Sequence, residues 1–449
     1  MNTVGSNNSF ILAISGVAAL GGLLFGFDTA VISGAIPAIQ TYFRLNEYAL
    51  GWAVSSILIG CALGAIVAGK LADRFGRRTM LMICALLFGL SAIGASEAGT
   101  LATFVAFRIV GGLGVGAAAI VSPLYISETA PAAWRGRLVS LYQLAIVFGI
   151  LLAYLCNYVF ASPVNGWRLM FASQTLPAIL FGLCLVAVPE TPRWLVGRKR
   201  MSAAAAILEK TVGSAAAPAE LALIEKSFGS SSGASLRELF DPAYRGVLGM
   251  GILLAVFQQV TGINAILYYA PTIFAKTGLD TSSSLLQTLA LGTVNLLATF
   301  GAIAWVDRLG RRALLLLGSA VMGVSLAALA LCFYTRTFEG YMVLSLMLLY
   351  VAAFACTLGP VTWVYLSEVF PNRIRAMAMS VATLALWLAD FGVAYAFPVM
   401  NAHLSIALTL LSYAFCCALA FVYVRARVPE TKGRRLEELE ILFVKGEPT

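Results

Sequence analysis

Charged residues are scarce in this chain of 449 residues, since Asp, Glu, Lys and Arg together make up only 11%. Soluble globular domains carry about 25% charged residues. Apolar residues reach 60%, and a soluble fold could not bury so much apolar surface. This composition excludes an ordinary soluble protein and favours one whose outer solvent is lipid.

Residues for metal or nucleophilic chemistry are also few. The chain has one His, His403, which we place near an outer loop, and its eight Cys lie in apolar stretches without CxxC spacing. No nucleophile is paired with a histidine. We therefore expect no metal site, no cofactor and no enzymatic activity.

Long apolar runs are abundant, and about 20 residues of helix are needed to cross a bilayer. The runs are continuous rather than alternating, which excludes a membrane β-barrel. They predict an all-α membrane protein with twelve transmembrane helices, at approximately 10–39, 51–70, 79–96, 101–127, 138–160, 167–188, 247–274, 284–306, 313–334, 341–366, 375–399 and 404–425.

The net charge of +9 comes from Lys and Arg residues that cluster in every second loop. This is the pattern of loops that stay inside the cell. It argues against nucleic acid as a partner and predicts a multi-pass protein of the cell inner membrane with both termini in the cytoplasm. The N-terminus shows no basic region or cleavage site, so we expect no removable signal peptide.

Three motifs occur twice, in the same order. The loop that starts at Asp73 recurs at Asp307, 234 residues later, while Glu128 recurs at Glu368 and Glu190 at Glu430, each 240 residues later. Transporters built from two parallel repeats bind substrate between the halves near the midplane. We divide the chain into a six-helix half (1–188), a cytoplasmic helical linker (189–246), a second six-helix half (247–427) and a cytoplasmic tail (428–449). Short amphipathic helices are expected around Leu236–Phe240 and Leu436–Phe443.

The repeated loops are rich in arginines and acids. One interpretation is topology alone, because arginines hold a loop inside. The other is a set of gating salt bridges that lock the outward-open state and break when the halves rock. The residues of that set are Asp73, Arg74, Arg78, Glu128, Arg135, Glu190, Arg193, Asp307, Arg308, Arg312, Glu368, Arg375 and Glu430.

Asp28 and Arg108 lie within apolar spans, where a charge costs about 2.5–3.5 kcal/mol by insertion scales. From the outer helix ends their depths are roughly 16 and 10 Å at about 1.5 Å per residue. The two side chains can therefore meet, either as a structural ion pair or as a functional one. Nearby, the glycines of Gly112-xxx-Gly116 predict close helix packing rather than a nucleotide loop.

Uncharged amides gather in spans five, seven and eight, together with large aromatic residues. Amides donate and accept hydrogen bonds, which suits sugar hydroxyls, and a ring face suits the C–H face of a pyranose. Helix–helix hydrogen bonding is the alternative for some of them. The residues are Gln143, Gln258, Gln259, Asn264, Asn295, Phe25, Tyr268, Tyr269, Trp363 and Trp387.

These features resemble the sugar porter branch of the major facilitator superfamily, and most of all bacterial D-xylose–proton symporters. The stretches that carry the resemblance are Gly21–Gly34, the two Asp-Arg-x-Gly-Arg-Arg loops, Pro189–Arg193, Gln258–Asn264, Gly359–Trp363 and Pro429–Gly433. Together they extend over nearly the whole chain.

The resemblance implies that Gln143, Gln258, Gln259, Asn264, Asn295 and Trp363 contact a sugar, with Phe25, Tyr269 and Trp387 around it. It further implies that Asp28 carries a coupled proton and that Arg108 tunes it. Two departures leave the sugar undecided between D-xylose and a related pentose or hexose. Leu386 stands where xylose symporters have Gln, and Asp390 replaces a neutral amide; Asp390 either is a solvated acid of the outer vestibule, or binds a hydroxyl or a second proton.

We therefore predict proton-coupled symport of a monosaccharide into the cell by alternating access, by a protein expected to be monomeric. A sugar uniporter is the first alternative, although such relatives tend to carry Asn in place of Asp28. A membrane sugar sensor is the second, although sensors would be expected to carry a long signalling tail.

Overall fold

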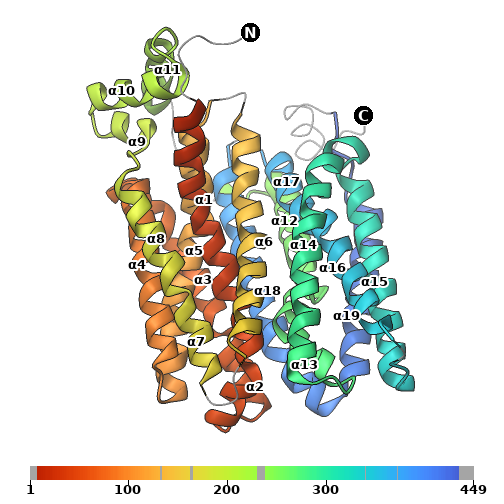
Figure 1. The fold of residues 1–449 in the computed structure, drawn as a ribbon. Helices are drawn as coiled ribbons and strands as arrows, with labels where there is room; N and C mark the ends of the chain where they lie inside the picture. The colour runs from red at the N-terminus through yellow and green to blue at the C-terminus, as the bar shows by residue number, and fades with distance from the viewer. Residues whose placement is uncertain are drawn as a thin grey trace.

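The computed structural model describes residues 8–131, 134–161, 165–229, 238–338, 340–371 and 373–433, which are mainly helical (Figure 1). Twelve helical segments in these ranges are long and apolar enough to cross a membrane. Each matches one predicted span, so the predicted all-α membrane fold is confirmed.

The helices before the linker are α1 (Asn8–Ala30), α2 (Ile32–Tyr42), α3 (Glu47–Phe75), α4 (Arg77–Ser96), α5 (Leu101–Thr129), α6 (Arg135–Val159), α7 (Gly166–Ser173) and α8 (Thr175–Val186). Those after it are α12 (Pro242–Val260), α13 (Ile263–Ala275), α14 (Thr281–Leu309), α15 (Arg311–Thr335), α16 (Met342–Cys356), α17 (Leu358–Val369), α18 (Arg375–His403) and α19 (Ile406–Arg427). The first helix of the second group thus starts at Pro242, ahead of the expected 247. These two groups, α1–α8 and α12–α19, stand side by side in Figure 1.

Four predicted spans are each divided into two helices, namely α1/α2, α7/α8, α12/α13 and α16/α17. The break between α12 and α13 has a local cause, because Gly262 adopts φ +92°, a left-handed conformation that suits glycine. Breaks in corresponding spans of two repeats mark substrate sites in transporters. The first span of each group, α1/α2 and α12/α13, is such a pair.

Helices α3 and α5 pack with their backbones in contact. A Cβ atom added at Gly112 would lie 2.0 Å from the carbonyl oxygen of Ile57, and one added at Gly116 would lie 2.0 Å from that of Cys61. The packing predicted for these two glycines is confirmed, since no larger residue fits without moving a helix.

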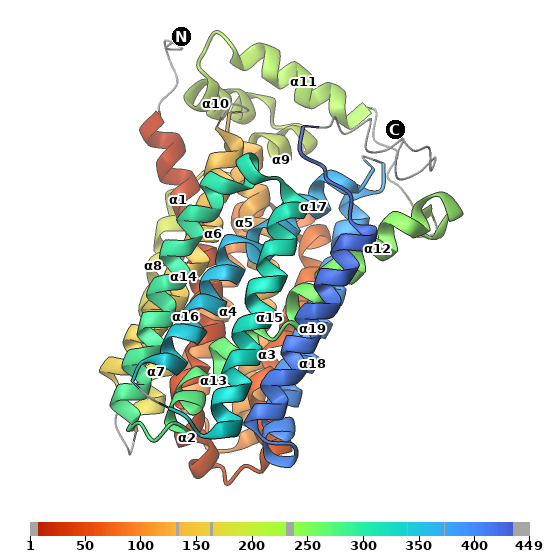
Figure 2. The same cartoon turned by 90° about the vertical axis from the view of Figure 1, so that its right-hand side faces the viewer.

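The linker holds α9 (Pro192–Gly197), α10 (Met201–Val212), α11 (Ala217–Gly229) and the short 3₁₀ turn η1 (Glu238–Phe240). It lies at the end of the bundle where α1 begins and α19 ends, called the terminal end below (Figures 1 and 2). Leu239 of the turn is buried, but Leu236 and the side chain of Phe240 fall outside the described part of the chain. The helix expected around Leu436–Phe443 lies outside it as well.

The two groups of helices touch through α3 with α18, α6 with α14 and α2 with α13. Several of these contacts lie at the end opposite the terminal end. There the Tyr48 hydroxyl is 3.3 Å from Nε2 of His403, and the rings of Trp52 and Phe391 are 6.3 Å apart. The groups are therefore closed against each other at that end.

Candidate functional site

A buried ion pair joins α1 to α5. Nη1 of Arg108 lies 2.6 Å from Oδ1 of Asp28 and also donates to the Asp28 carbonyl oxygen at 2.9 Å. The two side chains are 0% and 1% exposed. The predicted meeting of these two residues is confirmed. Within the described residues, Oδ2 of Asp28 and two guanidinium nitrogens of Arg108 have no hydrogen-bond partner, so the pair keeps unused donors and acceptors.

Neighbours that the sequence analysis did not single out shape the space around this pair. A Cβ atom at Gly111 would lie 2.5 Å from Oδ2 of Asp28, so glycine is needed for the carboxyl group to fit. The Phe171 ring lies under the guanidinium, with 5.6 Å between Cζ and the ring centroid. Gln174, buried at the α7–α8 break, also lies near Asp28. The sequence feature that could have identified Gln174 is its position as a polar residue within an apolar run.

A chain of hydrogen bonds connects the amides at the α12–α13 break. Nε2 of Gln258 donates to the carbonyl oxygens of Leu358 and Gly359 at 3.0 and 2.9 Å. Oε1 of Gln258 accepts from Gln259 at 3.5 Å, and Oε1 of Gln259 accepts from Asn264 at 3.0 Å. These contacts tie the two broken spans α12/α13 and α16/α17 together.

Asp390 of α18 ends this chain of hydrogen bonds. Its Oδ2 accepts from Nδ2 of Asn264 at 2.8 Å, and the residue is 0% exposed. The interpretation of Asp390 as a solvated vestibule acid is wrong for this conformation, because the residue is buried and bonded to Asn264.

The aromatic residues fall into two sets. The rings of Phe25 and Trp387 are 5.7 Å apart and tilted by 50°, and they form a contact between the two groups of helices. Tyr269 instead donates its hydroxyl to the carbonyl oxygen of Ala394 at 3.0 Å and stacks on Phe397 at 4.5 Å. In this conformation the Tyr269 hydroxyl is used by the protein itself. Tyr268 is buried beside it on α13.

Gln143, Asn295 and Trp363 are placed by three further helices. Gln143 is half-buried on α6, Asn295 is buried on the adjacent α14, and Trp363 is half-buried on α17. The structure shows no hydrogen bond between any of their side chains and another described residue. Their polar groups remain available for a ligand.

A cluster of charges joins four segments of the first group at the terminal end. Arg77 lies 2.9 Å from Asp73 and 3.0 Å from Glu128, and Thr191 donates to Glu128 at 2.6 Å. Glu190 accepts the backbone N–H groups that start α4, including that of Arg77 at 2.9 Å. Glu190 therefore acts as a cap for α4, where a carboxylate is favoured by the exposed N–H groups.

The second group repeats this cluster. Arg311 lies 2.8 Å from Glu368, Thr431 donates to Glu368 at 2.7 Å, and Glu430 accepts the backbone N–H of Arg311 at 2.8 Å. The repeated sequence motifs therefore form the same kinds of contact in both groups of helices.

Each described cluster joins helices of one group to the segment that follows that group, and its bridging arginine is Arg77 or Arg311, which the predicted gating set omitted. Arg78 and Arg312 donate to backbone carbonyl oxygens instead. The second arginine of each pair instead reaches a neighbouring helix end, since Arg78 donates to the last turn of α8 and Arg312 to that of α19. Only the geometry of the turn decides which arginine meets the acid.

The other residues of the predicted set have other surroundings. Arg74 and Arg193 stack on Phe75 and Phe228, and Arg375 donates to the carbonyl oxygen of Phe370. Arg135 and Arg308 are exposed, and the Asp307 side chain lies outside the described part.

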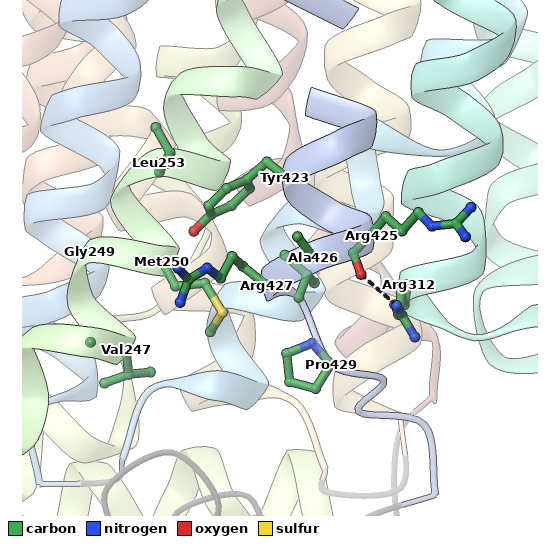
Figure 3. A pocket seen from close by; sticks show the side chains of 12 residues that line it. Val247, Gly249, Met250, Leu253, Arg312, Tyr423, Arg425, Ala426, Arg427 and Pro429 are labelled. Carbon is green, nitrogen blue, oxygen red and sulfur yellow. Dashed lines mark hydrogen bonds between the residues drawn. The ribbon is translucent and has the colours of Figure 1, made fainter. Parts of the chain in front are cut away.

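A groove of about 680 Å³ lies near the terminal end between α12 and α19 (Figure 3). Arg312, Arg425 and Arg427 line it together with Met250 and Tyr423. In Figure 3 the Arg312 side chain is bonded to the Arg425 carbonyl oxygen. None of the predicted sugar-binding residues lines this groove, so it is separate from the site described above.

Known proteins are similar along nearly the whole chain. The family described as Sugar (and other) transporter matches residues 14–443. The D-xylose-proton symporter of Escherichia coli (strain K12) is 42% identical, covering 97% of this chain and 96% of its own length. The arabinose-proton symporter of Bacillus subtilis (strain 168) is 41% identical, covering 97% and 96%. An inward open structure of the E. coli xylose transporter XylE superposes with a TM-score of 0.86 at 40% identity, covering 96% of this chain and 100% of that one.

Proposed function

The chain belongs to the sugar porter family of the major facilitator superfamily, and we propose that it moves a monosaccharide and a proton together into the cell, with Asp28 and Arg108 as the coupling pair. It is a transporter and not an enzyme. The sugar is D-xylose or a related pentose or hexose, in keeping with the sugars that its relatives are named for.

The buried pair of Asp28 and Arg108 is the observation that supports proton coupling. A charge costs free energy in the membrane interior, and an opposite charge at 2.6 Å offsets much of that cost. Moving the two helices apart, or admitting water, changes the balance between the ionised and protonated forms of Asp28. About 1.4 kcal/mol of differential stabilisation is enough to change protonation tenfold.

The sugar lies between the two groups of helices, close to the α12–α13 break. Gln258, Gln259 and Asn264 are held in one chain of hydrogen bonds, while Gln143, Asn295 and Trp363 approach from α6, α14 and α17. Phe25 and Trp387 pack against the apolar face of the ring. Tyr269 lines the side of the sugar site that is nearer to the end opposite the terminal end.

The terminal end is cytoplasmic, because the loops rich in Lys and Arg lie there. The structure is then inward-facing, since the two groups of helices meet at the other end. The repeated clusters hold the helices of each half together. During alternating access, the two halves (1–188 and 247–427) move as rigid units relative to each other. The protein acts as a monomer in the inner membrane.

Transport into proteoliposomes by Asp28→Asn tests the coupling. The amide keeps the shape of a protonated carboxyl group, so we expect sugar counterflow to persist while uphill accumulation driven by a proton gradient is lost. Glu209→Gln, an exposed acid of α10, is the matched control and should keep both activities. If Asp28→Asn still concentrates sugar, the coupling pair is elsewhere.

The same assay separates the alternatives. A uniporter would equilibrate sugar in the wild-type protein without responding to an imposed pH gradient. A sensor would bind sugar without counterflow. A panel of radiolabelled pentoses and hexoses in this assay identifies the substrate.

A further inference from the structure

A second acid is buried in the membrane-spanning region without a cation beside it among the described residues. Asp390 lies near the middle of α18 and is 0% exposed. Within the described residues it forms no salt bridge, whereas Asp28 is bonded to Arg108. The proposed function assigns a role to Asp28 but none to Asp390.

The neighbours of Asp390 are neutral. Asn264 donates to its Oδ2, while α3 and α13 bring Cys61 and Tyr268 close to it. The described charged residues of α3, α12, α17, α18 and α19 lie toward the helix ends. Arg108 is a buried cation that also lies near Cys61 and Tyr268, but its charge is offset by Asp28.

An ionised carboxylate buried without a cation costs several kcal/mol, even when one amide donates to it. A proton removes that cost. Oδ1 of Asp390 is buried and has no hydrogen-bond partner among the described residues, so there is an atom free to hold the proton. The protonated oxygen would be both a donor and an acceptor.

The hydrogen bonds of Asn264 connect this acid to the sugar. Its Nδ2 carries two hydrogens, which go to Gln259 and Asp390, and its Oδ1 stays free to accept from a hydroxyl group. Trp387, one turn before Asp390 on α18, keeps an unpartnered buried Nε1. A sugar seated against Trp387 and Asn264 therefore contacts the residue that donates to Asp390.

We propose that Asp390 is a second proton-binding group at the sugar site, and that its protonated form binds sugar more tightly than its ionised form. This inference rests on the proposed sugar site. It predicts that the protein takes up a proton at Asp390 on binding sugar, independently of Asp28. The sugar affinity then falls as the pH rises and Asp390 loses its proton.

Equilibrium binding in the Asp28→Asn variant tests this proposal without requiring transport. D-Xylose, D-glucose and L-arabinose are titrated by calorimetry between about pH 5.5 and 8.5 in buffers of different ionisation enthalpy, which reveals proton uptake. We expect Asp28→Asn to take up a proton on binding and to lose up to about tenfold in affinity per pH unit on the alkaline side. Asp28→Asn combined with Asp390→Asn should bind with no proton uptake and a flat pH profile.

Two results would overturn the inference: a flat profile without proton uptake in Asp28→Asn, or an unchanged profile after Asp390→Asn is added. Asp390→Asn retains an oxygen that can accept from Asn264, and size-exclusion chromatography with thermal unfolding checks its fold. If the double variant does not fold, the proton uptake of Asp28→Asn alone decides. Failure of the proposed coupling would instead appear as uphill transport by Asp28→Asn, which is a separate measurement.

Discussion

The Gln258 side chain uses both of its polar atoms within the protein. Both N–H groups of the Gln258 amide are used on the carbonyl oxygens of Leu358 and Gly359, where the α16/α17 span restarts. Its oxygen accepts from Gln259. One side chain thus sets the position of α17 and the orientation of the amides that we assign to the sugar.

Replacing Gln258 should therefore weaken sugar binding strongly. A buried polar group that loses its partner costs roughly 1–3 kcal/mol, which corresponds to about 5–150-fold in affinity. We expect Gln258→Ala to lose affinity in that range by calorimetry, whereas Gln40→Ala, an exposed amide of α2, should not. Wild-type affinity in a correctly folded Gln258→Ala protein would place the sugar elsewhere.

At the scale of helices, the pattern of apolar runs was sufficient to predict twelve spans but not their breaks. Gly262 looked like an ordinary residue of an apolar run, and only its backbone conformation shows that it separates α12 from α13. Likewise, the repeated Asp-Arg-x-Gly-Arg-Arg loops predicted charge clusters. Which arginine forms the salt bridge, Arg77 or Arg311 in the structure, depends on the conformation of each turn.

The contact between α3 and α5 predicts which glycines are essential for packing. A Cβ at Gly112 would overlap the Ile57 carbonyl oxygen, whereas a Cβ at Gly69 of α3 meets no atom within 4 Å. We expect Gly112→Ala to destabilise the protein by about 1–3 kcal/mol through overpacking. Gly69→Ala should be neutral or slightly stabilising, because alanine favours helix. Thermal unfolding in detergent compares the two, and equal melting temperatures would contradict the packing argument.

For the whole molecule, the positions of the cations predict its orientation in the membrane. The described ends of α1 and α19 and the linker share the terminal end of the bundle (Figure 1), and the loops rich in Lys and Arg should face the cytoplasm. That orientation places the closed contact between Tyr48 and His403 on the outside.

Tags at Asn7, within 198–235 and at Glu447 should therefore all be cytoplasmic. An impermeant reagent added to intact cells should leave them unlabelled and should label all three after the membrane is opened. A tag in the loop between Ser96 and Leu101 is the matched control and should react in intact cells. Labelling of any of the first three from outside would reverse the topology.

The membrane class, the twelve spans and the repeated motifs can be predicted from the sequence, because they depend on hydropathy, charge and spacing along the chain. Which groups meet can be read only from the fold: Asp28 meets Arg108, Asn264 meets Asp390, and Arg77 rather than Arg78 meets Glu128. Those pairings depend on how helices distant in the chain are rotated and how deeply they sit beside one another. Burial of Asp390 depends on tertiary structure in the same way, because residues of α13 distant in the chain enclose it.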